Sequence, residues 1–174
     1  MEEKVYTPIE VTLSTFDKLI NIYSKSYPAL LFRNIDLVSA IYNITVEEIE
    51  NLPISQFKDM VEVASNIDIS LGKDLTKTIT VDGVEYGTRA YSTNNFTFNV
   101  KEVVLLQELF IAKKDSYLAE IAAVLYHPIV DGKLVLNYDE KAILERKFKF
   151  LNLPVTAIDG YLSLLTDFIK DKYE

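Results

Sequence analysis

The change of hydrophobic period between residues 75 and 91 is the feature that most constrains the fold of this chain. Apolar and polar residues alternate there, with Ile79 before and Tyr86 after the pair Asp82-Gly83. Alternation is typical of strands, and Asp-Gly favours a type I′ turn because both positions of that turn need positive φ. The segment therefore predicts a β-hairpin.

Helical patterns occupy the rest of the chain, with apolar residues at three- and four-residue steps. The clearest helix start is a capping box formed by Thr45 and Glu48, and Asn99 and Glu102 form a second such pair. Helix starts are expected near residues 12–14, 29, 45, 55, 99, 115–116, 139 and 156. The predicted fold class is α+β and mainly α-helical, with about seven helices and one small antiparallel β-hairpin inserted mid-chain.

The chain has 174 residues, which fits a single domain spanning 1–174. Within it the pattern suggests two helical lobes, about 1–72 and 99–174, joined by the hairpin region at about 75–98. The sequence N-L-P-apolar-hydroxyl occurs at residues 51–55 and again at 152–156. Two interpretations are open: a duplicated lobe, or two independent uses of Pro and a hydroxyl residue to start a helix.

Three details of packing also follow from the pattern. The helix after Asn99 is apolar over a broad surface, which predicts central burial. The helix starting at Asp139 is expected to turn Leu144, Phe148 and Leu151 inward. A second Asp-Gly pair at residues 131–132 joins two short apolar runs and indicates another hairpin, although the fold class rests on the first.

The charge balance excludes the usual nucleic-acid-binding surface. The formal net charge is −8, from 26 acidic and 18 basic residues, so the average field repels a phosphate backbone. Basic residues gather at Lys141, Arg146, Lys147 and Lys149, but acidic residues interleave with them. We interpret this segment as a solvated helix face.

Cysteine is absent, which excludes disulfides, thiolate nucleophiles and zinc sites built on Cys. Its absence fits a reducing cytosol. The start of the chain has no apolar run of the signal-peptide type, and no apolar stretch approaches the roughly 20 residues that span a bilayer. We expect neither secretion nor membrane insertion.

The sequence contains few candidate catalytic residues. His127 is the only histidine, and its place beside Pro128 predicts a ring that caps the last carbonyls of a helix or lies half-buried. No calcium loop, nucleophile elbow or phosphate-cradling glycine loop is present. The sequence therefore predicts no enzyme and no catalytic, cofactor-binding or metal-binding residues.

Aromatic residues gather around the predicted hairpin and its exit. Tyr86, Tyr91, Phe96 and Phe98 are of the kind favoured at protein interfaces, so they are candidate partner-binding residues. The alternative is that they cover the inner face of the hairpin.

Four segments together resemble small assembly proteins of tailed bacteriophages, of the tail assembly chaperone or baseplate-hub-associated type. The segments are DLVSAIYNITVEEIENLPISQF (Asp36 to Phe57), TVDGVEYGTRAYSTNNFTFNVKEVVLLQEL (Thr80 to Leu109), AEIAAVLYHP (Ala119 to Pro128) and RKFKFLNLPVTAIDGYLSLL (Arg146 to Leu165). The similarity lies in helix starts and apolar positions, so it transfers no functional residue.

The resemblance implies a non-enzymatic structural or assembly protein that binds tail, baseplate or other virion proteins. It would act in the host cytoplasm during particle assembly, or be retained in the virion. The alternative function is an acidic regulatory or inhibitory module that binds a host protein. That function would need the acidic residues on one face, whereas the sequence scatters them.

Overall fold

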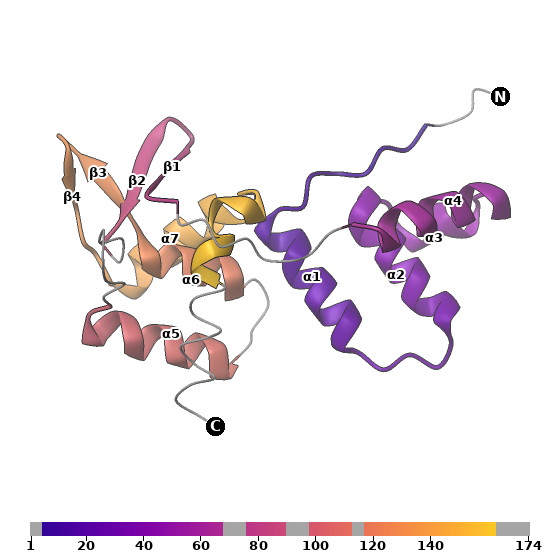
Figure 1. Ribbon diagram of the computed structural model, residues 1–174, viewed down its shortest axis with the longest axis horizontal. Helices are drawn as coiled ribbons and strands as arrows, with labels where there is room; N and C mark the ends of the chain where they lie inside the picture. The colour runs from indigo at the N-terminus through magenta and orange to yellow at the C-terminus, as the bar shows by residue number, and fades with distance from the viewer. Residues whose placement is uncertain (1–4, 68–75, 90–97, 113–116, 163–174) are drawn as a thin grey trace. The chain divides into compact units, whose positions relative to one another are not determined.

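Helices dominate the computed structural model, and a small antiparallel sheet accompanies them, which confirms the predicted α+β class (Figure 1). The structure describes residues 5–67, 76–89, 98–112 and 117–162. The chain forms two units: the first contains residues 1–11 and 15–70, and the second contains residues 12–14 and 71–174. We refer to them as the N-terminal unit and the C-terminal unit.

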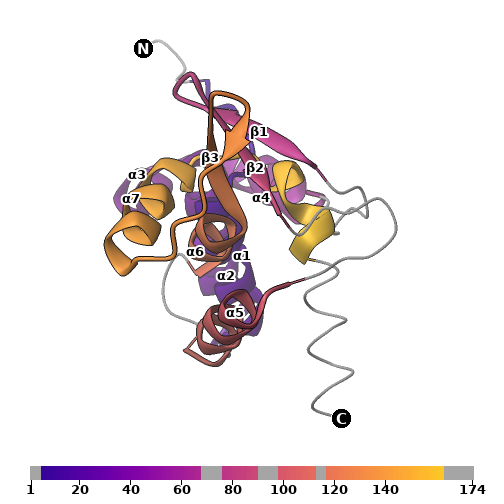
Figure 2. The ribbon, with the colours of Figure 1, turned by 90° about the vertical axis from the view of Figure 1, so that its left-hand side faces the viewer.

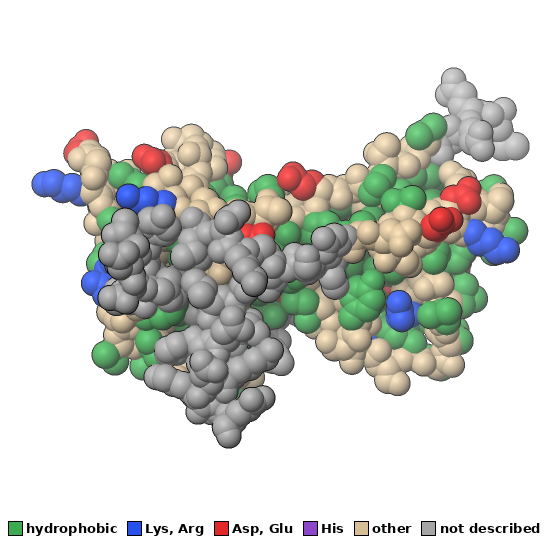
Figure 3. All heavy atoms as spheres, in the orientation of Figure 1, with side chains coloured by type: hydrophobic (Ala, Val, Ile, Leu, Met, Phe, Trp, Pro, Cys, Tyr) green, Lys and Arg blue, Asp and Glu red, His purple; other side chains and the backbone are tan. Residues whose placement is uncertain are grey.

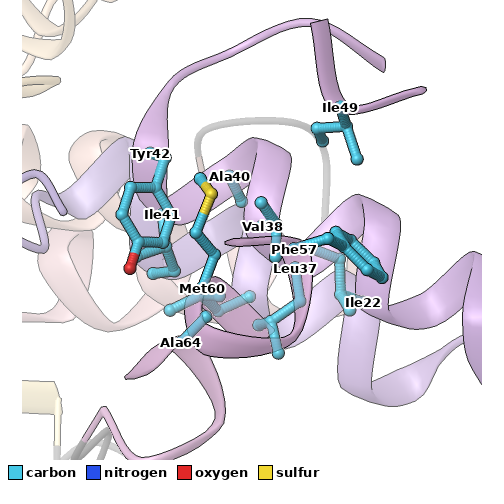
Figure 4. Close-up of a cluster of buried hydrophobic side chains, with 11 residues drawn as sticks. Ile22, Leu37, Val38, Ala40, Ile41, Tyr42, Ile49, Phe57, Met60 and Ala64 are labelled. Carbon is cyan, nitrogen blue, oxygen red and sulfur yellow. The ribbon is translucent and has the colours of Figure 1, made fainter. Parts of the chain in front are cut away.

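The N-terminal unit is helical. Its helices are α1 (Leu13–Ser24, whose first two residues fall in the C-terminal unit), α2 (Leu30–Tyr42), α3 (Val46–Glu50) and α4 (Ile54–Ser65). Side chains of α2 and α4 form most of its core, as Figure 4 shows with Leu37, Val38, Ile41, Phe57 and Met60. These positions recur at three- and four-residue steps, so each helix buries one stripe.

Local signals set the ends of these helices. Asn43 ends α2 at φ 50°, in the left-handed conformation that asparagine tolerates at a helix end. The Thr45–Glu48 capping box is also confirmed, because Thr45 Oγ1 accepts from the Glu48 N–H and Glu48 accepts from the Thr45 N–H. The prediction that Ser55 caps α4 is two residues late, since Pro53 occupies the cap position and Ser55 lies inside the helix.

The C-terminal unit packs helices against the sheet. Its helices are α5 (Val100–Ala112), α6 (Tyr117–Leu125) and α7 (Glu140–Phe150), followed by the short 3-10 helix η1 (Val155–Ala157). Seven of the nine residues of α6 are buried, so this helix is the centre of the unit. The prediction of central burial for α5 is wrong: α5 buries Glu102 and Leu106, while Val100 and Ile111 are exposed.

Four strands form the sheet in the order β1-β2-β3-β4, all antiparallel. They are β1 (Thr78–Val81), β2 (Val84–Thr88), β3 (Tyr126–Val130) and β4 (Lys133–Leu134). Figure 2 shows β1, β2 and β3 side by side. Both expected hairpins are present, and Asp82, Gly83, Asp131 and Gly132 all have positive φ, between 49° and 75°.

Pairing between the hairpins changes two expectations. Tyr86 of β2 lies opposite Pro128 of β3, so the first hairpin belongs to the C-terminal unit and does not join two lobes. The helix expected to reach His127-Pro128 ends at Leu125, and the chain continues directly as β3. A residue before proline avoids the α conformation, and β2 supplies hydrogen-bonding partners for an extended chain.

The face that α7 buries also differs from the prediction. Ile143, Arg146 and Phe150 are buried, whereas Leu144 and Phe148 are exposed and Leu151 is half-buried. The buried set still follows three- and four-residue steps, but it includes a charged residue. The rotation lets Arg146 reach backbone carbonyls inside the unit, as described below.

The two N-L-P segments precede different structures. Pro53 and Pro154 have the same conformation, with φ of −57° and −55° and ψ of 139° and 138°. Pro53 leads into the twelve-residue α4, whereas Pro154 leads into the three-residue η1. Both interpretations of the repeated N-L-P pattern require a proline that can precede a helix. The shared backbone conformation of Pro53 and Pro154 is therefore compatible with either one.

We expect the substitution Gly83→Ala to destabilise the C-terminal unit by about 1 kcal/mol. Gly83 has φ +75° and no heavy atom within 4 Å of an added Cβ, so backbone strain is the only cost. Urea denaturation measures the change. Asp82→Gly is the matched control, since Asp82 already has φ 49° and glycine relieves that strain; equal losses in both variants would contradict the argument.

Candidate functional site

Large apolar side chains are exposed at the start of α2. Leu30, Leu31 and Phe32 are consecutive and are 64%, 53% and 53% exposed. Neighbouring residues of a helix point about 100° apart, so a run of three spreads around the helix and does not form one stripe. Figure 3 shows hydrophobic side chains at the surface over the α1–α4 region.

A hollow of about 350 Å³ adjoins these side chains. Leu31, Phe32 and Ile35 of α2 line one side, and α3 and the start of α4 provide the other. The remaining lining residues are Ile49, Glu50, Leu52, Ile54 and Phe57. Glu50 is the one charged residue of this lining, and Ile54 is 67% exposed at the rim.

A second hollow of about 370 Å³ shares Phe32, Ile35 and Glu50 with the first. Its other lining residues are Lys25, Ser26, Tyr27, Pro28, Asp36 and Val46. Because the two hollows share three lining residues, they are adjacent, and we refer to them together as the apolar groove. The groove is apolar at the end next to α4 and polar at the end next to the segment between α1 and α2.

Polar groups at that end are paired within the chain. The Tyr27 hydroxyl donates to Asp36 Oδ2 at 2.7 Å, and Lys25 Nζ lies 3.8 Å from the same oxygen. Lys25 also lies 4.8 Å from the centre of the Tyr27 ring. Burial raises the pKa of Tyr27 to about 12, and the hydrogen bond to Asp36 adds to the effect, so the hydroxyl keeps its proton.

Glu50 lies between the two hollows and is exposed. The capping box fixes the start of α3, and the Ile49 side chain is buried, so Glu50 is held at the groove by a short but anchored helix. Over the described ranges of the chain, the Glu50 carboxylate makes no hydrogen bond or ion pair. It is therefore a carboxylate available to a partner.

Tyr86 and Phe98, two of the aromatic residues proposed from the sequence, do not line the groove. Tyr86 is 3% exposed and packs edge-to-face on Phe150 with ring centres 5.0 Å apart, so it covers the inner face of the hairpin and is no longer a candidate for partner binding. Phe98 is half-buried. Tyr91 and Phe96 lie outside the described residues, and their proposed role stays a prediction.

His127 is fully buried in β3, not half-buried at a helix end as predicted. Its Nδ1 accepts from the Asn137 N–H at 3.2 Å, so the neutral ring carries its proton on Nε2. Nε2 completes no hydrogen bond within the described structure. Burial, together with a smaller effect of the Arg146 charge, lowers the pKa of His127 to about 4, and interaction with the Val124 backbone partly opposes them.

Buried polar residues of the C-terminal unit form a network around Tyr138. The Tyr138 hydroxyl donates to Glu102 Oε1 at 2.6 Å and accepts from Asn99 Nδ2 at 3.0 Å. Glu102 Oε2 accepts from the Asn99 N–H, and Asn99 Oδ1 accepts from the Glu102 N–H, which confirms the second capping box. The Tyr138 ring also meets His127 edge-to-face at 4.7 Å.

Arg146 belongs to this interior and not to a solvated face, which corrects the interpretation of the basic segment. Nε donates to the Ala123 carbonyl at 2.8 Å and Nη2 donates to the Asn137 carbonyl at 2.7 Å. Lys147 pairs with Glu120 at 2.7 Å, while Lys141 and Lys149 are exposed. These contacts join α6, the segment before α7, and α7, so we assign the polar network a structural role.

Neither a metal site nor a membrane-spanning helix occurs in the part of the chain that the structure describes. It holds no group of three or more His, Cys, Asp or Glu side chains able to bind a metal ion. None of its helices has the length and apolar character needed to cross a membrane. No protein-family model, curated protein or solved structure matches this chain.

We expect His127 to make folding stability depend on pH. Its pKa is lower in the folded chain, so protonation favours unfolding: the stabilisation is complete above about pH 6.5 and is lost as pH falls toward about 4, by up to about 3 kcal/mol. In His127→Asn an oxygen can replace Nδ1 as the acceptor. Urea denaturation from pH 7 to 4 should give a smaller loss for this variant than for the wild type. An identical loss would contradict the assignment.

We expect Tyr138→Phe to cost about 1–3 kcal/mol of unfolding free energy, because it leaves a buried carboxylate oxygen of Glu102 without its donor. Burial raises the pKa of Tyr138 to about 12, so the hydroxyl remains a donor at neutral pH. Thermal or urea denaturation measures the loss. Tyr23→Phe, at a ring 43% exposed, is the control, and an equally small change in both variants would refute the network's contribution.

Proposed function

We propose that this chain is a binding protein of bacteriophage assembly, which takes an apolar segment of a tail, baseplate or other virion protein into the apolar groove. The observation that carries the proposal is the exposure of Leu31, Phe32 and Ile54 around a formed hollow. Contiguous exposed apolar surface of this kind marks sites of protein association.

The lining of the groove suits a helical or extended segment of a protein. Its floor includes the buried Ile49 and Phe57 and its rim carries half-exposed aliphatic and aromatic side chains. Anchors of a partner that fill such hollows contribute most of the binding energy at an interface. This supports a protein ligand, whereas the acidic balance of the chain opposes a nucleic-acid ligand.

The assembly context comes from the resemblance of the sequence to phage assembly proteins. The resemblance implies a protein that handles tail or baseplate components during virion assembly. Binding in the host cytoplasm, and either release or retention in the virion, are both compatible with a surface groove. The groove gives this proposal a physical site, which the buried Tyr86 does not.

We expect the double variant Leu31→Ser/Phe32→Ser to lose binding of its virion partner by about tenfold or more. Both side chains are about half exposed, so folding stability should change by no more than about 0.5 kcal/mol per site. The measurement is an affinity pull-down of the tagged chain from infected cells, or from cells that co-express tail and baseplate proteins. Mass spectrometry identifies the bound proteins at moderate salt.

Val63→Ser is the matched control, since Val63 is 45% exposed on α4 and does not line the groove. Tail or baseplate proteins retained by the wild type and the control, and lost by the groove variant, would support the proposal. Recovery of these proteins by all three chains would show that the groove is not their binding site. Recovery of a host enzyme alone would favour the acidic inhibitory module.

A further inference from the structure

We infer that the segment bound in the apolar groove carries a lysine or arginine beside its apolar anchors, and that this cation pairs with Glu50. The inference rests on the proposed function, because it names the chemistry of the partner at the same groove. It concerns a protein segment from another molecule and not a second copy of this chain.

Glu50 lies at the junction of the two hollows that form the groove. Glu50 contributes to both hollows, so a segment lying along the groove passes it wherever its apolar side chains are placed. The side chains that share its two hollows include Phe32 and Ile35, and an apolar segment packed on them would remove water from around the carboxylate. A carboxylate that loses water without gaining a cation or donor opposes binding.

The charged residues that line the groove differ in whether they are paired within the chain. Lys25 is the basic residue of the lining, and it lies 3.8 Å from Asp36 and over the Tyr27 ring. Asp36 also accepts from the Tyr27 hydroxyl. Asp36 is thus compensated within the chain, whereas Glu50 is not, within the part of the chain that the structure describes.

Residues 5–67 hold eight acidic and four basic side chains, and one of the acidic ones, Glu47, is exposed on α3 near Glu50. The field at the groove therefore attracts a cation. A second copy of the chain would bring the same excess of carboxylates against this surface. A basic, amphipathic segment of a different protein fits the groove better on the same grounds.

The test uses a library of random displayed peptides, each long enough for about four helical turns. The full-length chain selects binders, and peptides that also bind Leu31→Ser/Phe32→Ser are discarded. We expect the remaining peptides to be enriched in Lys or Arg at a fixed spacing from apolar anchors. Glu50→Gln should weaken these peptides by about two- to fivefold, the range of a partly exposed ion pair.

Charge reversal at Glu50 provides the decisive comparison. Selection on Glu50→Lys should shift the enriched residue from Lys or Arg to Asp or Glu, whereas Glu62→Lys, an exposed substitution on α4 outside the groove with the same change of net charge, should leave the preference unchanged. A shift in both variants would attribute the preference to net charge and overturn the inference.

The remaining outcomes separate this inference from the proposed function. Groove-dependent peptides without a basic residue would overturn the pairing with Glu50 and leave the groove as a binding site. Failure to obtain any peptide that depends on Leu31 and Phe32 would overturn both. Peptides that copy a segment of this chain would show that the groove binds a second copy.

Discussion

Pairing of β2 with β3 is the interaction on which the C-terminal unit depends. It joins two hairpins that are local in sequence into one sheet, with Tyr86 opposite Pro128 and Gly87 opposite His127. An isolated two-stranded hairpin is marginal in water, and a four-stranded sheet packed against helices is not. The same pairing removes His127 from solvent and brings the end of α6 next to the first hairpin.

The groove arises from a different constraint, which is the geometry of a single helix. A helix that presents one stripe to its core cannot hide a run of three large apolar residues. Leu30, Leu31 and Phe32 form such a run directly after Ala29, where α2 begins. The run was visible in the sequence and could have been used as a signal of an exposed apolar surface. Tyr86, one of the aromatic residues chosen from the sequence, instead covers the inner face of the first hairpin.

Features fixed by a few neighbouring residues were predictable. Both Asp-Gly turns, both capping boxes and the left-handed Asn43 are set by steric and hydrogen-bonding preferences within four residues. What the sequence could not provide was orientation. The face that α7 buries depends on carbonyls of α6 and of residue 137 that Arg146 reaches, and the groove depends on how α3 and α4 meet α2. Such contacts between distant segments have no local signature.

The Glu102 carboxylate has one oxygen in the cap of α5 and the other bonded to a hydroxyl 36 residues away. Helix ends ordinarily fray independently of the rest of a protein, since their caps are local. Here the first turn of α5 cannot open without also breaking the hydrogen bond between Glu102 and Tyr138. The start of α5 is thereby joined to the cooperative unit that contains His127 and Arg146, and hydrogen exchange at that helix end would report the opening of the unit and not the opening of one turn.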